Sequence, residues 1–234
     1  MKKIGKWMII FLCIFSLISG CYLSNYSHNT DHQALVNTKD VSIKKTKFGY
    51  FFDGPGKEDA LIFYPGGKVE DIAYSSLLKE IAANGMDCFL VHMPGNLAVL
   101  NPNKGKEVFE SYTYKNWYMG GHSLGGSMAA SFVSKNENQF QGLILLASYS
   151  MADLRDENIK VLSIYGSKDQ VLNRKRLKEN QKNLPDSNEV YVISNGNHAN
   201  FATYGKQAGD GKASISRAQQ IKETAIKITE MVNE

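Results

Sequence analysis

A serine in a glycine-flanked motif is the residue of this chain whose surroundings point most directly to chemistry. Residues 121–125 read Gly-His-Ser-Leu-Gly, with Ser123 at the centre, and they follow the apolar run 117–119. Such a motif between a strand and a helix is typical of a nucleophile elbow, which exposes the serine hydroxyl on a sharp turn. A hydroxyl attacks a carbonyl only when a base removes its proton. The chain should therefore also supply a base, an acid and oxyanion donors.

The motif alone does not establish a nucleophile, because a chance match in a chain of this length has a probability of ~0.1. A base and an acid elsewhere in the chain must support it. His198 is the candidate base, since it follows the apolar run 189–193 and its imidazole could accept the Ser123 proton. His92 also follows an apolar run and competes for this role. His122 lies inside the motif, and we expect its side chain to point away from the reacting face. The other two histidines lie in a polar N-terminal segment.

Asp169 is the candidate acid, in a turn directly after the apolar run 161–165. Its carboxylate would accept the Nδ1 proton of His198, set the tautomer and stabilise the imidazolium. Asp153 is the alternative acid, but it lies further from the end of its preceding strand. The choice between the two aspartates stays open at this point, with Asp169 ranked first.

Two backbone N–H groups should stabilise the oxyanion. One is that of Leu124, the residue after the nucleophile, and the other should come from the loop 65–68, which reads Pro-Gly-Gly-Lys. Gly67 is the predicted donor, and the neighbouring Lys68 is the alternative. A plain Pro-Gly turn would give the same letters, so the loop carries weight only together with the other candidates.

Alternating apolar runs and helical patterns predict how these residues are positioned. Short apolar runs predict seven strands, at 47–52, 60–64, 87–91, 117–119, 142–147, 161–165 and 189–193. Helical patterns predict helices at 72–84, 104–114, 124–135, 173–183 and 214–232. This alternation favours an α/β fold, a mainly parallel doubly wound sheet of about seven strands with helices on both faces. Ligands bind beyond the carboxyl ends of such strands, where all the candidates fall.

The spacing after residue 147 leaves no room for a large cap domain, since only residues 148–160 separate two predicted strands. We therefore expect a shallow, open pocket shaped by the segments 93–102, 149–154 and 201–211. The aromatic residues that could wall this pocket, or simply fill the core, are Tyr74, Tyr149, Phe201 and Tyr204.

From about residue 47 to its end, the chain resembles α/β-hydrolases, in which the triad follows the chain order Ser, Asp, His. It is similar to small, lid-poor bacterial members with a Pro-Gly-Gly-Lys-Val loop, here 65–69, a Met-Pro-x-Asn-Leu-Ala segment, here 93–98, and the tail motif at 196–211. The resemblance implies that the triad is Ser123, Asp169 and His198. It also implies that the loop 201–211 packs over the site.

The N-terminus has the pattern of an export signal. Three lysines precede the uncharged apolar core 7–18, which is too short for an ordinary membrane span. Residues 17–21 read Leu-Ile-Ser-Gly-Cys and resemble a bacterial lipobox, which implies cleavage before Cys21 and lipidation of its thiol. An ordinary secretory signal or an uncleaved anchor is the alternative. We predict a signal peptide at 1–20, a polar tether at 21–42 and a hydrolase domain at 43–234, anchored at the extracytoplasmic face of the cell membrane.

Composition excludes some partners. The chain has 27 Lys and Arg against 23 Asp and Glu, and the signal carries three of the lysines. No broad basic surface follows, so nucleic acid is not an expected partner. Beyond the signal and Cys21, Cys88 is the one remaining cysteine, and no Cys/His spacing suggests a metal site. We expect neither a metal nor an organic cofactor.

Together these features predict a serine hydrolase that cleaves an ester or other acyl compound through an acyl-enzyme. Its expected partners are a small acyl substrate and, through the lipid anchor, a membrane. An acyltransferase would use the same triad with a different acceptor. A non-catalytic binding lipoprotein on a hydrolase scaffold is the alternative from another class, because a fold does not by itself imply an activity.

Overall fold

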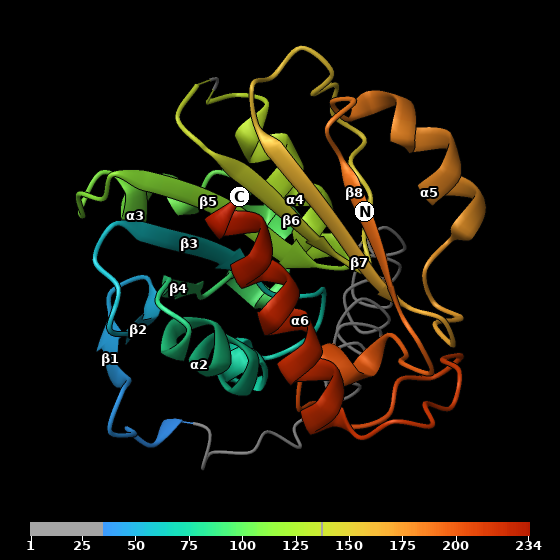
Figure 1. The fold of residues 1–234 in the computed structure, drawn as a ribbon, viewed down its shortest axis with the longest axis horizontal. Coiled ribbons are helices and arrows are strands. Elements are labelled where there is room, and N and C mark those ends of the chain that lie inside the picture. The colour runs from blue at the N-terminus through green and yellow to red at the C-terminus, as the bar shows by residue number, and fades with distance from the viewer. Residues whose placement is uncertain (1–34, 137) are drawn as a thin grey trace, which may run out of the picture.

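Eight strands form a single sheet in the part of the chain that the structure describes, residues 35–136 and 138–234 of a computed structural model (Figure 1). The strands are β1 (Ser42–Thr46), β2 (Gly49–Asp53), β3 (Asp59–Tyr64), β4 (Asp87–Val91), β5 (Asn116–His122), β6 (Gly142–Leu146), β7 (Lys160–Gly166) and β8 (Glu189–Ile193). Their order across the sheet is β1-β2-β4-β3-β5-β6-β7-β8. The pairs β1–β2 and β2–β4 are antiparallel, and all other neighbours are parallel. The predicted fold class is confirmed.

Helices follow most of the parallel strands. They are α2 (Ser75–Ala83), α3 (Gly105–Phe109), α4 (Leu124–Val133), α5 (Arg174–Asn180) and α6 (Arg217–Asn233). The one-turn 3₁₀ helices are η2 (Asp71–Tyr74), η3 (Pro94–Asn96), η4 (Ala98–Leu100), η5 (Gln181–Asn183) and η6 (Ala199–Phe201). The starts of α5 and α6 are set by Asn173 and Ser216, whose side chains accept hydrogen bonds from backbone N–H groups in the first turn.

The helices cover both faces of the sheet. In Figure 1, α2 and α6 lie side by side in front of the sheet, and α4 lies behind it. Alternate residues of a strand point to opposite faces, so Leu61 and Phe63 of β3 pack on the side of α2 and α6. Ile62 and Tyr64 of the same strand pack on the side of α3 and α4. Burial on both faces explains why the inner strands, β3 to β7, read as mainly apolar runs.

The first strand, β1, was not predicted from the sequence. It reads Ser-Ile-Lys-Lys-Thr, and its side chains are exposed or half-buried because it forms an edge of the sheet. Charged residues suit such an edge, since they discourage pairing with another chain. β1 begins at Ser42, the last residue of the predicted tether, and the preceding Val41 is buried in the core. The sheet therefore has one strand more than expected.

No large cap domain is inserted between β6 and β7 in the described residues, where the connection is limited to residues 147–159. This agrees with the prediction from the sequence. The predicted signal peptide and Cys21 lie outside the described residues. Within 35–136 and 138–234, no helix has the length and hydropathy needed to cross a membrane.

Candidate active site

Ser123 lies on a strained turn between β5 and α4. Its backbone has φ 52° and ψ −122°, a left-handed conformation that costs on the order of 1–3 kcal/mol in a non-glycine residue. Two hydrogen bonds hold this turn in place. The Ser123 N–H donates to the Leu146 carbonyl at 2.9 Å, and the Ser148 hydroxyl donates to the Ser123 carbonyl at 2.7 Å. The serine is thus held at the carboxyl end of the sheet, as a nucleophile elbow requires.

The two glycines of the motif have the steric role expected of them. A Cβ on Gly121 would lie 2.6 Å from the Gly125 carbonyl carbon. A Cβ on Gly125 would lie 2.2 Å from the carbonyl oxygen of Pro65 and 2.3 Å from that of Tyr64. Real Cβ atoms essentially never approach so closely. The missing side chains therefore let α4 pack directly against the loop that follows β3.

His198 and Asp169 form a buried pair. The His198 Nδ1 lies 2.9 Å from the Asp169 Oδ2, and both side chains are almost completely excluded from solvent. The other carboxylate oxygen accepts hydrogen bonds from the N–H groups of Val171 and Leu172, at 2.9 and 2.8 Å. Burial alone would raise the pKa of Asp169, but the His198 ring and the two amides hold it below its ordinary value. An ionised Asp169 keeps the proton on Nδ1 and leaves Nε2 as an acceptor.

The loop 201–211 supports His198 from behind. The Asp210 carboxylate accepts hydrogen bonds from the N–H groups of His198 and Ala199, at 3.3 and 2.9 Å. The sequence did not lead us to select Asp210 as a site residue. Its position between Gly209 and Gly211 was the available signal. No residue of this loop is among those that line the cleft at Ser123, so the loop lies behind His198 and not along the cleft. It anchors the backbone of the candidate base instead.

A cleft of about 270 Å³ opens beside Ser123 and His198. The residues that line it are Ser123, Leu124, Ser127, Ala147, Ser148, Tyr149, Met151, Val171, Leu172, Asn173 and His198. Among the described residues, the His198 Nε2 has no hydrogen-bond partner, so it is not bonded to the Ser123 hydroxyl in this state. Catalytic hydrogen bonds often tighten only when substrate binds. Of the four aromatic residues predicted as possible walls, Tyr149 alone is in this set.

The predicted oxyanion donors, the N–H groups of Leu124 and Gly67, lie in neighbouring segments. Lys68 is the alternative to Gly67. The Lys68 N–H already donates to the Asn96 carbonyl at 2.8 Å. The Gly67 N–H has no hydrogen-bond partner within the described chain. A Cβ on Gly67 would lie 2.9 Å from the Leu124 side chain, so the Gly67 backbone packs directly against that side chain. The geometry favours Gly67 over Lys68 as the second donor.

Asp153, the alternative acid, lies in another ion pair. Its two oxygens accept hydrogen bonds from the Arg155 guanidinium at 2.9 and 2.6 Å. Its side chain is 56% exposed, and the arginine lowers its pKa to about 2. The hydrogen bond to the His198 Nδ1 comes from Asp169, so the structure brings Asp169 and not Asp153 to the candidate base.

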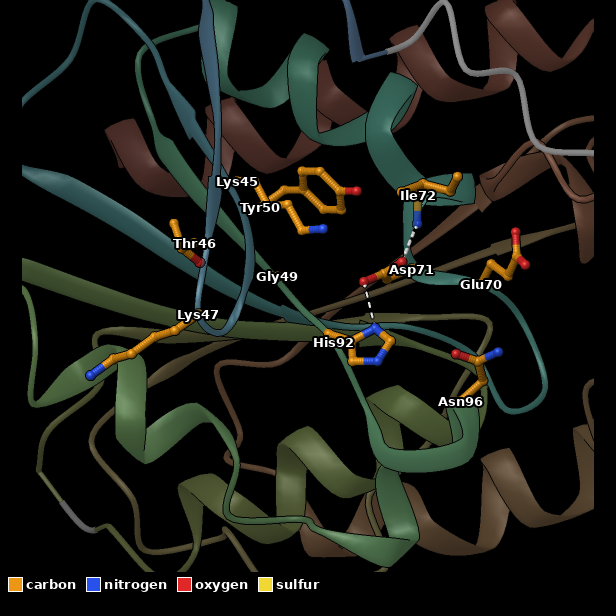
Figure 2. A pocket seen from close by; sticks show the side chains of 10 residues that line it. All are labelled: Lys45, Thr46, Lys47, Gly49, Tyr50, Glu70, Asp71, Ile72, His92 and Asn96. Atoms are coloured by element: carbon orange, nitrogen blue, oxygen red, sulfur yellow. Dashed lines mark hydrogen bonds and ion pairs between the residues drawn. The ribbon is translucent and has the colours of Figure 1, made fainter.

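His92, the competing base, belongs to a different pocket. Figure 2 shows its ring facing Asp71, and the His92 Nδ1 lies 3.0 Å from the Asp71 Oδ2. The pocket has a volume of about 600 Å³, and none of Ser123, Asp169 and His198 lines it. His92 is therefore not placed to take the Ser123 proton.

The His122 ring does not line the cleft at Ser123, but it packs against the ring of the candidate base. His122 is 1% exposed, and its ring centroid lies 4.5 Å from that of His198. Within residues 35–136 and 138–234, no group of three His, Cys, Asp or Glu side chains is arranged to hold a metal ion. Cys88 is fully buried, and burial raises the pKa of its thiol.

Comparison with known families identifies the class. The model of the alpha/beta hydrolase family matches residues 60–222, well over half of the chain. The chain belongs to the alpha/beta hydrolase family. A comparison with curated protein sequences gives no match.

Solved structures share this fold at low sequence identity. A predicted CIB-like hydrolase from Thermoplasma acidophilum is 13% identical with a TM-score of 0.61, over 81% of this chain and 99% of that chain. Est1E from Butyrivibrio proteoclasticus is 12% identical with a TM-score of 0.60, over 84% and 100%. The carboxylesterase CesB (YbfK) from Bacillus subtilis is 11% identical with a TM-score of 0.60, over 92% and 98%. At such identities the likeness establishes the fold alone.

Proposed function

We propose that this protein is a serine hydrolase that cleaves carboxylic esters through an acyl-enzyme. The observation that carries the proposal is the buried hydrogen bond between Asp169 and His198, together with a cleft that both His198 and the strained Ser123 line. A pair that fixes the histidine tautomer beside a serine that lines an open cleft is the arrangement that nucleophilic catalysis needs. The names of two structural neighbours, Est1E and the carboxylesterase CesB, agree with ester chemistry.

The proposed reaction has two halves. The Ser123 Oγ attacks the ester carbonyl carbon while the His198 Nε2 takes its proton, and the N–H groups of Leu124 and Gly67 stabilise the oxyanion. The intermediate then expels the alcohol, which receives the proton from His198, and the acyl group stays on Ser123. In the second half, His198 takes a proton from water as the water oxygen attacks the acyl-enzyme. The intermediate then collapses, His198 returns the proton to the Ser123 Oγ, and the carboxylic acid leaves.

The cleft favours a short acyl group. Its volume of about 270 Å³ lies at the lower end of ligand pockets, which measure roughly 300–1,000 Å³. Leu124, Val171 and Leu172 give it an apolar lining, and Met151 is 59% exposed beside it. With no large cap domain over it, a long chain would stay largely in water. We therefore expect turnover to fall as the acyl chain lengthens.

A fluorophosphonate probe and a panel of p-nitrophenyl esters test this function. We expect one probe molecule per chain, attached at Ser123 as read by peptide mass spectrometry, and faster hydrolysis of acetate and butyrate than of palmitate. A folded protein that is neither labelled nor active would support the binding-protein alternative. Transfer of the acyl group to an added alcohol in preference to water would support the acyltransferase.

We further propose that Cys21 is lipidated and anchors the domain at the extracytoplasmic face of the cell membrane. The support is the Leu-Ile-Ser-Gly-Cys sequence directly after the apolar core. Cys21→Ser should abolish the incorporation of labelled palmitate and release the protein from the membrane fraction. Cys13→Ser, a matched change within the signal, should leave both unchanged. Continued labelling of Cys21→Ser would contradict this assignment.

A further inference from the structure

A buried row of polar groups connects the loop 65–68, which carries the candidate oxyanion donor, with the ring of His198, the candidate base. The Gly66 N–H donates to the Tyr74 hydroxyl at 3.0 Å, and this hydroxyl lies 2.8 Å from the His122 Nδ1. The His122 ring packs against the His198 ring, with 4.5 Å between the centroids. The side chains of Tyr74, His122 and His198 are at most 1% exposed. The row thus connects a loop after β3 with a loop after β8.

The hydrogen bonds of this row determine where the protons lie. The Tyr74 hydroxyl accepts from Gly66, and among the described residues its own proton has no acceptor other than the His122 Nδ1, so we assign that proton to the bond with His122. His122 is then neutral, with its proton on Nε2. Burial, followed by the nearby His198, lowers the pKa of His122 well below its ordinary value. Burial raises the pKa of Tyr74, which keeps this donor protonated.

The row is also tightly packed. A Cβ on Gly66 would lie 2.7 Å from the Tyr74 hydroxyl and 2.9 Å from the His122 Nδ1, so only glycine leaves room for this contact. The Phe201 ring flanks His122, with 5.5 Å between the ring centroids. A rotation of the His122 ring would break the bond to Tyr74 and move the surface on which His198 rests.

We propose that Tyr74 and neutral His122 are positioning residues that hold the His198 ring and the Gly66–Gly67 backbone in fixed relation. This role rests on the proposed function, because it matters only if His198 is the base and Gly67 an oxyanion donor. In the proposed reaction, the imidazolium and the oxyanion form in the same step from different loops. A misplacement of about 1 Å between reacting groups costs on the order of 10²-fold in rate. A neutral His122 also avoids repelling the imidazolium.

The test is the kinetics of p-nitrophenyl acetate hydrolysis by the full chain and its variants. Tyr74→Phe and His122→Phe should each lower kcat by about 10- to 100-fold, with KM changed by less than threefold. The double variant should be no slower than the slower single variant, because both changes break one unit. His122→Gln should recover at least fivefold over His122→Phe, since its Oε1 can accept the Tyr74 proton.

Tyr204→Phe is the matched control. Its hydroxyl is bonded to Gln207 at 2.8 Å and lies outside the row, so kcat should stay within twofold. Additive losses, losses equal to those of Tyr204→Phe, or a change in KM alone would overturn the positioning role. If His122→Phe does not fold, judged by thermal unfolding, Tyr74→Phe and His122→Gln decide instead. A wild-type protein without esterase activity or fluorophosphonate labelling would overturn the proposed function itself, and this role with it.

Discussion

Ser123→Ala is expected to lower kcat for ester hydrolysis by about 10⁵- to 10⁶-fold and to abolish fluorophosphonate labelling. Without the Oγ, no acyl-enzyme can form, and only binding and the oxyanion donors remain. Both hydrogen bonds that hold the elbow use the backbone of Ser123 and not its hydroxyl. The variant should therefore keep its melting temperature within a few degrees of the wild type.

Ser127→Ala is the control for this change. Ser127 lines the same cleft, and its hydroxyl donates to the Tyr149 carbonyl at 2.8 Å, on the side wall. Loss of that hydroxyl should change kcat by less than threefold. A folded Ser123→Ala protein that retains more than 1% of the wild-type kcat would refute Ser123 as the nucleophile.

Asp169→Asn should lower kcat by about 10⁴-fold, because it would leave His198 with the wrong tautomer. One oxygen of Asp169 accepts the N–H groups of Val171 and Leu172. The asparagine oxygen would take this place, and its NH₂ group would then face the His198 Nδ1. The ring would accept that hydrogen bond at Nδ1 and carry its own proton on Nε2, where it cannot take one from Ser123.

Asp153→Asn provides the comparison, because Asp153 is the alternative acid that the sequence alone did not exclude. It is paired with Arg155 at the surface, so its loss should change kcat by less than twofold. The measurement is kcat for both variants on the same ester, with circular dichroism to show that each is folded. The reverse order of effects would reassign the acid to Asp153.

Much of the fold was predictable because the inner parallel strands, β3 to β7, are buried on both faces and therefore read as apolar runs. The seven predicted strands and five predicted helices all have counterparts, often one or two residues longer or shorter. β1 escaped prediction because its sequence is mostly polar and its two lysines resemble a loop, whereas β8, the other edge strand, is largely exposed but reads as an apolar run. The helix predicted at 104–114 is cut to α3 (Gly105–Phe109), which shows how weakly a short pattern sets a boundary.

The residues of the candidate site were also predictable from the sequence. Ser123, Asp169 and His198 each follow a parallel strand, and parallel strands end at one edge of the sheet, so their order along the chain was enough to gather them. The loop 65–68 follows another strand at the same edge. Local glycine chemistry also marked Ser123, because Gly121 and Gly125 are needed where two backbones nearly touch.

The sequence by itself therefore determined the class of fold, the candidate nucleophile and the positions of its candidate partners, since all of these depend on local pattern and strand order. Tertiary structure alone decided between Asp169 and Asp153, turned His122 toward His198, and assigned Asp210 to the backbone of the candidate base. Each of these is a contact between segments far apart in the chain. Such contacts depend on how loops of neighbouring strands pack in space, and a one-dimensional pattern carries no measure of that distance.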